Sequence, residues 1–412
     1  MKKILFFFTF LVFISNIYSS GGSLYTRYGI GDLYYSGTSY KLSLGGAGTS
    51  LSDEKYVNLN NPATWNSIKN VRFGTSLISN SSIIDDGIEN VTYTHVRFSG
   101  FHIAFPVKES LGIGFVFGMT PYSVVNYEVI NKVSQEDIDN YDEIYEGSGG
   151  LSKLFFGVSY KLPFDISLGA TFDYYTGSFK YKSSFIFEES TLTNSFFDTE
   201  FDYKGLGGTF GLESPDLATV FKLNNISNFR FGLTYEFSGK INTDTSLVAL
   251  TTLGENEFES AKVKTDLPHK IGAGLNFTIN EKYLVVLDYL YQPWSKYEQN
   301  GLKTDYLRDL SRYSIGFEYG EQVKRFASFW ELIRYRGGLS FEQSQYDING
   351  EGINQLGIHA GISLPLGLEN TIDIGFMYGS RGSTDSNLLK ENIFQASVSL
   401  NFGEFWFVRR DR

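Results

Sequence analysis

The 412-residue chain contains no cysteine, which excludes several classes of protein. Without cysteine there is no disulfide framework, no thiolate metal site and no lipoprotein anchor. Basic residues are not in excess either, because the net charge is −11 and no basic stripe occurs. Nucleic-acid recognition starts from a positively charged surface, so nucleic acid is not an expected partner.

Long apolar segments are missing apart from one at the N-terminus. Lys2 and Lys3 precede an apolar run over residues 4–17, and small residues follow at 19–22. This order predicts a secretory signal peptide, residues 1–20, since the alternative of a retained anchor needs about 20 apolar residues. No later segment approaches a spanning helix, so membrane residence requires a closed β-barrel in a bacterial outer membrane.

Glycine and aromatic residues are abundant, with 43 Gly, 28 Tyr and 37 Phe. From Val71 onward the apolar period is two: along residues 229–237, for example, aromatic and aliphatic residues alternate with Arg230, Gly232 and Thr234. Such a strand has one apolar and one polar face. About fourteen strands are predicted, near residues 70–79, 92–106, 110–122, 150–162, 166–187, 196–211, 228–239, 262–279, 282–294, 310–321, 332–347, 352–365, 369–381 and 390–403.

A soluble sandwich also alternates, so alternation alone does not decide the fold. The strands run to about ten residues, their apolar faces end in aromatic residues, and long connections alternate with short ones, as in outer-membrane barrels. We therefore predict an all-β fold, a transmembrane antiparallel β-barrel over residues 69–412. Residues 212–227 are ambiguous: they interrupt the sixth strand or lengthen a turn.

Connection lengths predict the orientation of this barrel. The short turns at 106–109, 162–165, 280–282 and 365–369 should be periplasmic. The long polar connections at 123–149, 240–261 and 294–309 should be extracellular.

The stretch 45–65 has no apolar period of its own. Gly45, Gly46 and Gly48 permit a sharp turn or a close backbone approach, because they carry no Cβ. Asn61 followed by Pro62 and Ala63 has the chemistry of a helix start. From these residues alone, a surface loop with a one-turn helix explains the stretch.

Residues 25–33 (YTRYGIGDL), residues 44–48 and the triplet of Asn61, Pro62 and Ala63 together resemble the N-terminal plug of FadL-type outer-membrane proteins. These are long-chain fatty acid and hydrocarbon transporters, and the chain looks most like the branch found in Bacteroidetes-type bacteria. Short motifs at 335–338 and 378–382 extend the resemblance over essentially the whole chain. It implies fourteen strands and a hatch inside the lumen over residues 21–68, which includes Gly45, Gly46, Gly48, Asn61, Pro62 and Ala63.

The third predicted strand carries Gly112, Gly114 and Gly118, followed by Pro121. Glycine lacks a packing side chain and proline donates no ladder bond, so this strand bends easily. In FadL-type proteins a kink in the third strand opens the wall sideways, and the resemblance implies a lateral gate here. The alternative is a glycine-rich strand packed against the hatch.

The resemblance implies a channel for passive uptake of hydrophobic small molecules, fatty acid or hydrocarbon-like, that needs no cofactor. The alternative is a non-transport role in type IX secretion, as a surface-attachment shuttle, or a structural role in the outer membrane. Expected partners are outer-membrane lipid, a hydrophobic small-molecule ligand and the barrel assembly machinery.

No enzyme or metal site is predicted. Ser52 to Lys55 matches S-x-x-K by letters, but the partner motifs of that chemistry are absent. His359 lies on a polar strand face, where a lumen-facing side chain is the simpler interpretation than a triad member. The acidic residues within 136–146 lack the order of a calcium loop, so a solvated loop is expected.

Overall fold

The structure is a computed structural model that describes residues 22–35, 37–135, 138–187, 193–251, 254–299, 301–320, 328–367 and 369–404. The predicted signal peptide therefore lies outside the described residues. Within these ranges fourteen strands form the barrel wall: β2 (Val71–Asp85), β3 (Asn90–Lys108), β4 (Ile113–Gln135), β5 (Ile138–Lys161), β6 (Ser167–Phe187), β7 (Ser195–Glu213), β8 (Ile226–Ser238), β11 (Lys270–Ile279), β12 (Tyr283–Gln292), β15 (Leu310–Tyr319), β16 (Arg334–Ile348), β17 (Glu351–Pro365), β18 (Thr371–Arg381) and β19 (Lys390–Glu404).

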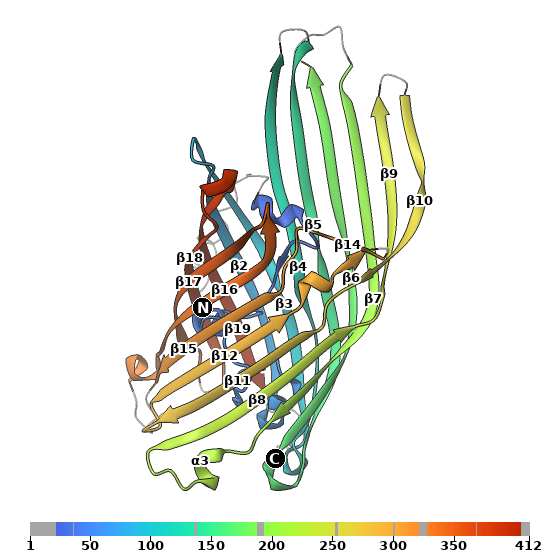
Figure 1. The fold of residues 1–412 in the computed structure, drawn as a ribbon. Coiled ribbons are helices and arrows are strands. Elements are labelled where there is room, and N and C mark those ends of the chain that lie inside the picture. The colour runs from blue at the N-terminus through green and yellow to red at the C-terminus, as the bar shows by residue number, and fades with distance from the viewer. Residues whose placement is uncertain are drawn as a thin grey trace, which may run out of the picture.

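Each strand pairs antiparallel with the next along the wall, and β19 pairs with β2 to close the sheet. The closing ladder runs from Glu404 opposite Val71 to Lys390 opposite Asp85. A closed barrel leaves no sheet edge along such a ladder, which is the condition for strands to cross a bilayer. The predicted barrel of about fourteen antiparallel strands is confirmed (Figure 1).

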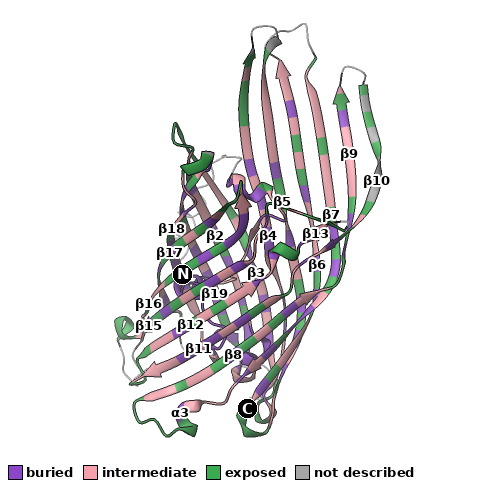
Figure 2. Cartoon of the chain, viewed as in Figure 1, coloured by how far each residue is buried: buried purple, intermediate pink, exposed green. Residues whose placement is uncertain are grey.

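The apolar face of each strand points away from the lumen. On β5, Leu154 and Phe156 are exposed while Phe155 and Ser159 are buried, and the same alternation follows the other strands (Figure 2). An outward face of aromatic and aliphatic side chains suits lipid, and the polar face turns inward. Among the described residues, no helix is long and apolar enough to cross a membrane.

The four short turns lie at one end of the barrel, the short-turn end, because the strands alternate in direction. This end also carries η3 (Glu109–Leu111), η4 (Pro163–Asp165), α3 (Leu217–Val220) and η6 (Phe329–Leu332). The ambiguous residues 212–227 prove to be a lengthened turn: β7 ends at Glu213, and Asp216 caps α3 through its bond with the Ala218 nitrogen. Which end faces the periplasm stays a prediction.

The long polar connections contain regular strands, which the sequence analysis did not predict. β4 and β5 pair with each other over 123–135 and 138–149, and the described residues of 241–266 form β9 (Ile241–Thr251) and β10 (Gly254–Asp266). Because β9 pairs with the upper part of β7, the strands β4, β5, β6, β7, β9 and β10 rise together as a tall wall above the rest of the barrel (Figure 1). Residues 294–309 hold η5 (Trp294–Lys296), β13 (Glu298–Gln299) and β14 (Leu302–Lys303), and η7 (Asp385–Asn387) precedes β19.

Residues 22–70 form the N-terminal segment, with η1 (Leu24–Arg27), β1 (Asp32–Leu33), α2 (Ser39–Ser43) and η2 (Pro62–Ser67). α2 contacts β16 to β19, whereas η2 contacts β4 to β7 on the other side of the barrel. All five residues of α2 are buried. The segment therefore lies across the lumen and meets opposite walls.

Candidate functional site

The glycine cluster of the N-terminal segment lies against glycine on the barrel wall. Gly45 and Gly46 have φ of +73° and +82°, the left-handed region that glycine adopts without a steric penalty. A Cβ added to Gly338 of β16 would lie 2.5 Å from the Gly45 nitrogen, so the two backbones touch. Arg312 of β15 donates to the Gly45 carbonyl oxygen at 3.1 Å and fixes this contact.

Gly48 supplies a backbone donor to Asp288 of β12. The N–H groups of Gly48 and Thr49 donate to the Asp288 carboxylate at 2.9 and 2.8 Å, and the Thr49 hydroxyl donates at 2.7 Å. The Lys41 ammonium is buried near this carboxylate, and within the described residues it has no hydrogen-bond partner. Burial lowers the pKa of Lys41 to about 7.

Asn61 begins η2, as the sequence predicted. Its side-chain oxygen accepts the Ala63 N–H at 3.0 Å, and Pro62 occupies the first turn. The Asn61 amide donates to the carbonyl oxygens of Thr49 and Leu212, which ties the helix to the glycine stretch and to β7. All six residues of the predicted hatch therefore lie in the lumen.

Three inward-facing arginines, Arg312, Arg336 and Arg381, connect the wall to this segment. The Arg336 side chain, on β16, is fully buried, donates to Glu318 at 2.6 Å and to Asp373 at 3.1 Å, and lies 4.1 Å from the centre of the Tyr40 ring. Buried charges require such partners, because desolvation of an unpaired charge is costly.

The other two arginines hold different parts of the segment. Arg312 pairs with Glu342 at 2.6 Å, and its guanidinium lies 4.5 Å from the Tyr35 ring centre. Arg381 pairs with Glu391 on β19 and donates to Asp32 of β1 at 2.8 Å. The sequence reasoning missed all three arginines, although two of them stand in the motifs 335–338 and 378–382.

A second buried network lies on the opposite wall. Lys153 of β5 is 3.2 Å from Glu236 of β8 and 3.6 Å from Asp173 of β6. Glu236 also accepts the Tyr175 hydroxyl at 2.9 Å and pairs with Lys270. These contacts join wall strands to each other, so their role is to hold the barrel together.

The wall between β3 and β4 is only partly paired. Their ladder runs from Lys108 opposite Ile113 up to Phe101 opposite Met119 and stops there. Above this point β3 pairs with β2 alone, and β4 pairs with β5 and, at two residues, with β1. The third barrel strand therefore borders a gap in the wall.

The residues predicted to bend this strand lie at or below the start of the gap. Gly112 precedes β4 with φ +56°, Gly114 pairs with Pro106, and Gly118 pairs with His102. Pro121 follows the last pair with β3 and lies opposite Ser152 of β5. Gly114 and Gly118 belong to the intact ladder, whereas Gly112 lies in the turn before it, and the separation begins next to Pro121.

β1 covers the gap from inside. Asp32 and Leu33 pair with Val124 and Ser123 of β4, and the Tyr34 N–H donates to the Tyr122 carbonyl oxygen at 3.0 Å. The Tyr34 hydroxyl bonds to Ser99 of β3, and the Arg97 guanidinium lies 5.8 Å from its ring centre. Tyr34 thus bridges the two strands that do not pair with each other.

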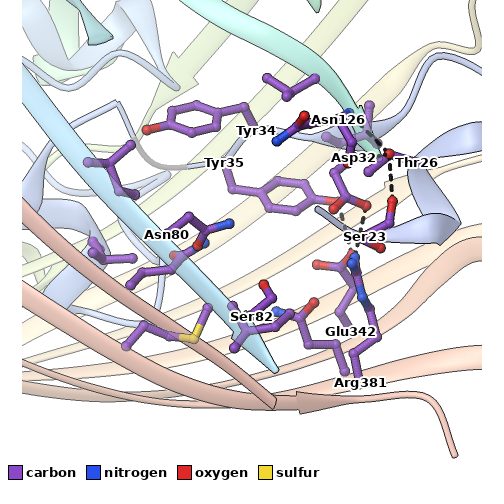
Figure 3. A pocket seen from close by; sticks show the side chains of 18 of the residues that line it. Ser23, Thr26, Asp32, Tyr34, Tyr35, Asn80, Ser82, Asn126, Glu342 and Arg381 are labelled. Carbon is purple, nitrogen blue, oxygen red and sulfur yellow. Dashed lines mark hydrogen bonds and ion pairs between the residues drawn. The ribbon is translucent and has the colours of Figure 1, made fainter. Parts of the chain in front are cut away.

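A cavity of about 100 Å³ lies beside this bridge (Figure 3). One side is apolar and is formed by Leu42, Ile78, Met377 and Ile393, which pack together. The rim is polar. Buried atoms without a hydrogen-bond partner among the described residues lie on Asn80, His95, Arg97 and His359, all of which line the cavity.

The residues weighed for catalysis or metal binding have structural partners. Ser52 donates to the Thr64 carbonyl oxygen at 3.1 Å, and His359 shares a 2.9 Å hydrogen bond with Ser340. Within the described residues no group of three His, Asp or Glu could hold a metal ion. Residues 136–137 of the acidic stretch lie outside the described residues.

A closed fourteen-stranded barrel with an apolar outer face and an N-terminal segment across its lumen is the architecture of FadL-type outer-membrane proteins. The BamG family model matches residues 1–411, and the chain belongs to that family. No curated protein sequence matches the chain. Its assignment to the Bacteroidetes branch remains a prediction.

Solved structures show the same fold at low sequence identity. The CymD monoaromatic hydrocarbon channel is 16% identical with a TM-score of 0.60, and the match covers 90% of this chain and 98% of that one. The Ralstonia pickettii toluene transporter TbuX is 16% identical over 89% and 98% of the chains, TM-score 0.58. A Pseudomonas aeruginosa FadL homologue is 11% identical over 90% and 99%, TM-score 0.61. This likeness supports an outer-membrane location.

Proposed function

We propose that the chain is an outer-membrane channel for passive uptake of hydrophobic small molecules, fatty acid or hydrocarbon-like. The N-terminal segment acts as a hatch, and the molecule leaves sideways through the gap between β3 and β4. The observation that carries this proposal is the gap itself, which opens above Phe101 and Met119 and is covered by the N-terminal segment, through β1, Tyr34 and Thr26. The solved structures with this fold include a hydrocarbon channel and a toluene transporter.

The cavity beside the gap suits a small passenger with an apolar body. Leu42, Ile78, Met377 and Ile393 provide an apolar surface directly inside the wall. Outside the wall, Phe98 and Phe117 are exposed toward lipid on the two strands that border the gap. An apolar molecule that moves from the first surface to the second exchanges one apolar environment for another, so no energy source is needed.

Opening requires β1 to leave the edge of β4. Asp32 is held by Arg381 at 2.8 Å and by the Tyr346 hydroxyl at 2.9 Å, and Tyr34 is held by Ser99. These bonds close the gap in the resting state. Ligand contacts that are stronger in the open state would shift the balance toward opening.

The test locks β1 to β4 with a disulfide. Leu33 and Ser123 face each other in the short antiparallel ladder, at a non-hydrogen-bonded position, where the Cα atoms approach to about 4.5 Å. The variant Leu33→Cys/Ser123→Cys adds the only two cysteines in the chain, so oxidation forms one defined bond. Uptake of a radiolabelled hydrophobic substrate should be lost after oxidation and return after reduction.

Each single-cysteine variant serves as the control, because it carries the same side chains without the cross-link. Equal uptake by the oxidised and reduced double variant would overturn the lateral route.

A non-transport role in secretion, surface attachment or outer-membrane structure is the second candidate. It is favoured by the filled lumen, in which Arg312, Arg336 and Arg381 hold the N-terminal segment. This candidate expects no uptake in either redox state of the double-cysteine variant.

A further inference from the structure

In the tall wall, one edge of β4 lacks a partner strand over part of its described length. On one side β4 pairs with β5 from Gly114 to Gln135. On the other side its described pairs end with β1 at Val124, and Asn126 bonds through its N–H and C=O to the Thr26 hydroxyl, both at 3.2 Å. Beyond Asn126, no strand of the described ranges pairs with this edge.

The backbone of this edge points toward an additional strand. The Asn126 N–H and C=O face away from β5, because they bond to Thr26 of the N-terminal segment. Backbone direction alternates along a strand, so the N–H and C=O groups of Ile130 and Lys132 face the same way. A row of outward amide groups is a template for β pairing. β1 already uses the lower part of this edge in antiparallel pairing.

The usual devices that protect an edge are weak here. Residues 124–135 (VVNYEVINKVSQ) contain no proline and one lysine, and they include four valines and one isoleucine. On the lumen side, buried Tyr127 continues into an aromatic row, with its ring centre 6.5 Å from that of Tyr181 and Tyr181 5.7 Å from Phe201. On the other side, Ile130 is 54% exposed.

We propose that this edge, from Ile130 to Ser134, binds an extended segment of a partner polypeptide as an added antiparallel strand. The segment would alternate apolar and polar side chains, with its apolar residues on the face that Tyr127, Val129 and Val133 share. A strand is the occupant because it satisfies outward N–H and C=O groups in regular succession, and it would continue the pairing that β1 begins. This site is independent of uptake through the barrel.

The probe is a fluorescent ten-residue peptide that alternates valine or tyrosine with threonine and carries a lysine at each end. Binding to the full-length protein in detergent is followed by anisotropy and by hydrogen exchange. Saturable binding should slow exchange at the Ile130 and Lys132 amides. The same peptide, N-methylated along its centre, should not bind, since it cannot donate to the edge.

Two variants of Ile130 distinguish the contribution of its backbone N–H to peptide binding from that of its side chain. Ile130→Pro removes the outward N–H but leaves the β4–β5 bonds of the neighbouring residues, since proline is tolerated on an edge whose N–H faces solvent. It should weaken binding about tenfold or more. The matched control, Ile130→Thr, keeps the N–H and should bind like the parent protein. Heat-dependent gel mobility checks that both variants fold.

Three results would overturn the proposal. The first is the absence of saturable binding by the unmethylated peptide. The second is equal binding by Ile130→Pro and the parent protein. The third is concentration-dependent self-association that Ile130→Pro abolishes, because the edge would then belong to a second copy of the chain.

Discussion

At the scale of single residues, local chemistry was predictable and long-range partners were not. Asn61 and Pro62 start a helix because the cap and the first turn involve only their immediate neighbours. Arg336 finds Glu318 and Asp373 because β15, β16 and β18 come together on one side of a closed barrel. The sequence spacing of these residues does not show that the three strands lie side by side. The charged contacts of the lumen therefore could not be assigned before the structure.

Lys41 should destabilise the folded chain near neutral pH. Burial lowers its pKa from 10.5 to about 7, so as the pH falls from about 10.5 to about 7 the unfolded chain binds a proton that the folded chain does not. The stability of the parent protein should therefore fall by roughly 1.4 kcal/mol per pH unit over this window from this group. Lys41→Met should raise the heat-denaturation midpoint clearly at pH 6 and much less at pH 10.

The control for this prediction is Lys69→Met, because Lys69 belongs to the same segment but its side chain is 58% exposed. Its midpoint should stay close to that of the parent protein at both pH values. A Lys41→Met midpoint that rises equally at pH 6 and pH 10 would contradict a role for the buried charge.

Neutralising Arg336 should cost much more stability than neutralising its neighbour Arg334. Arg336→Gln leaves the buried carboxylates of Glu318 and Asp373 without their main cation, which should cost about 3–5 kcal/mol. Arg334→Gln is the matched control: Arg334 also pairs with Glu318, but its side chain is 37% exposed and its loss should cost about 1 kcal/mol or less. Denaturant titration of the refolded proteins, followed by tryptophan fluorescence, measures both; similar values would refute the argument.

At the scale of elements, the period of two predicted the wall strands, including both ends of β19 to within a residue. It did not predict the tall wall, because turn residues and charges made 123–149 and 240–261 look like loops. Pairing with β6 and β7 keeps those residues extended. The predicted lateral gate at Gly112, Gly114, Gly118 and Pro121 stays a prediction, and the structure adds that the pairing of β3 with β4 ends at Met119, just before Pro121. Whether β3 and β4 pair depends on the residues of both strands, whereas the glycine content that was used describes β4 alone.

Gly118 should be required for close packing within the β3–β4 ladder. A Cβ added there would collide with the Phe101 carbonyl oxygen, which is backbone and cannot turn away. Gly118→Ala should therefore lower stability by about 1–3 kcal/mol. Gly337→Ala is the control, because the nearest atom to its added Cβ is the His359 carbonyl oxygen at 3.8 Å, an ordinary contact. Heat-dependent gel mobility compares the two.

The outcome also decides between the two earlier interpretations of the third strand. Loss of stability in Gly118→Ala fits a glycine-rich strand that packs closely. A variant of unchanged stability that no longer takes up substrate would instead mean that Gly118 serves to bend the strand.

At the scale of the whole molecule, the sequence predicted a closed outer-membrane barrel of about fourteen strands. The prediction came from strands with one apolar face and aromatic ends, from connections of alternating length, and from the absence of a predicted spanning helix. The course of the N-terminal segment through the lumen was available only from resemblance. Its own residues fit a surface loop equally well. Three contacts hold it inside the lumen: the backbone of Gly45 packs against Gly338, Arg312 donates to the Gly45 carbonyl oxygen, and Asp288 accepts the Gly48 N–H. These contacts form only when the wall has closed.

Removal of residues 45–65 should separate transport from a structural role. These residues fill the lumen between β12, β16 and β7, through Gly48 on Asp288, Gly45 on Gly338 and Asn61 on Leu212. When a short glycine–serine linker replaces them, the wall ladders remain and the barrel should still show heat-dependent gel mobility. Its permeability should rise, measured as substrate uptake in cells and as conductance in planar bilayers. A linker of the same composition inserted between Gly301 and Leu302, outside the lumen contacts, is the control. Unchanged permeability with loss of surface attachment of secreted proteins would instead support the secretion role, because the segment would then serve a partner and not a pore.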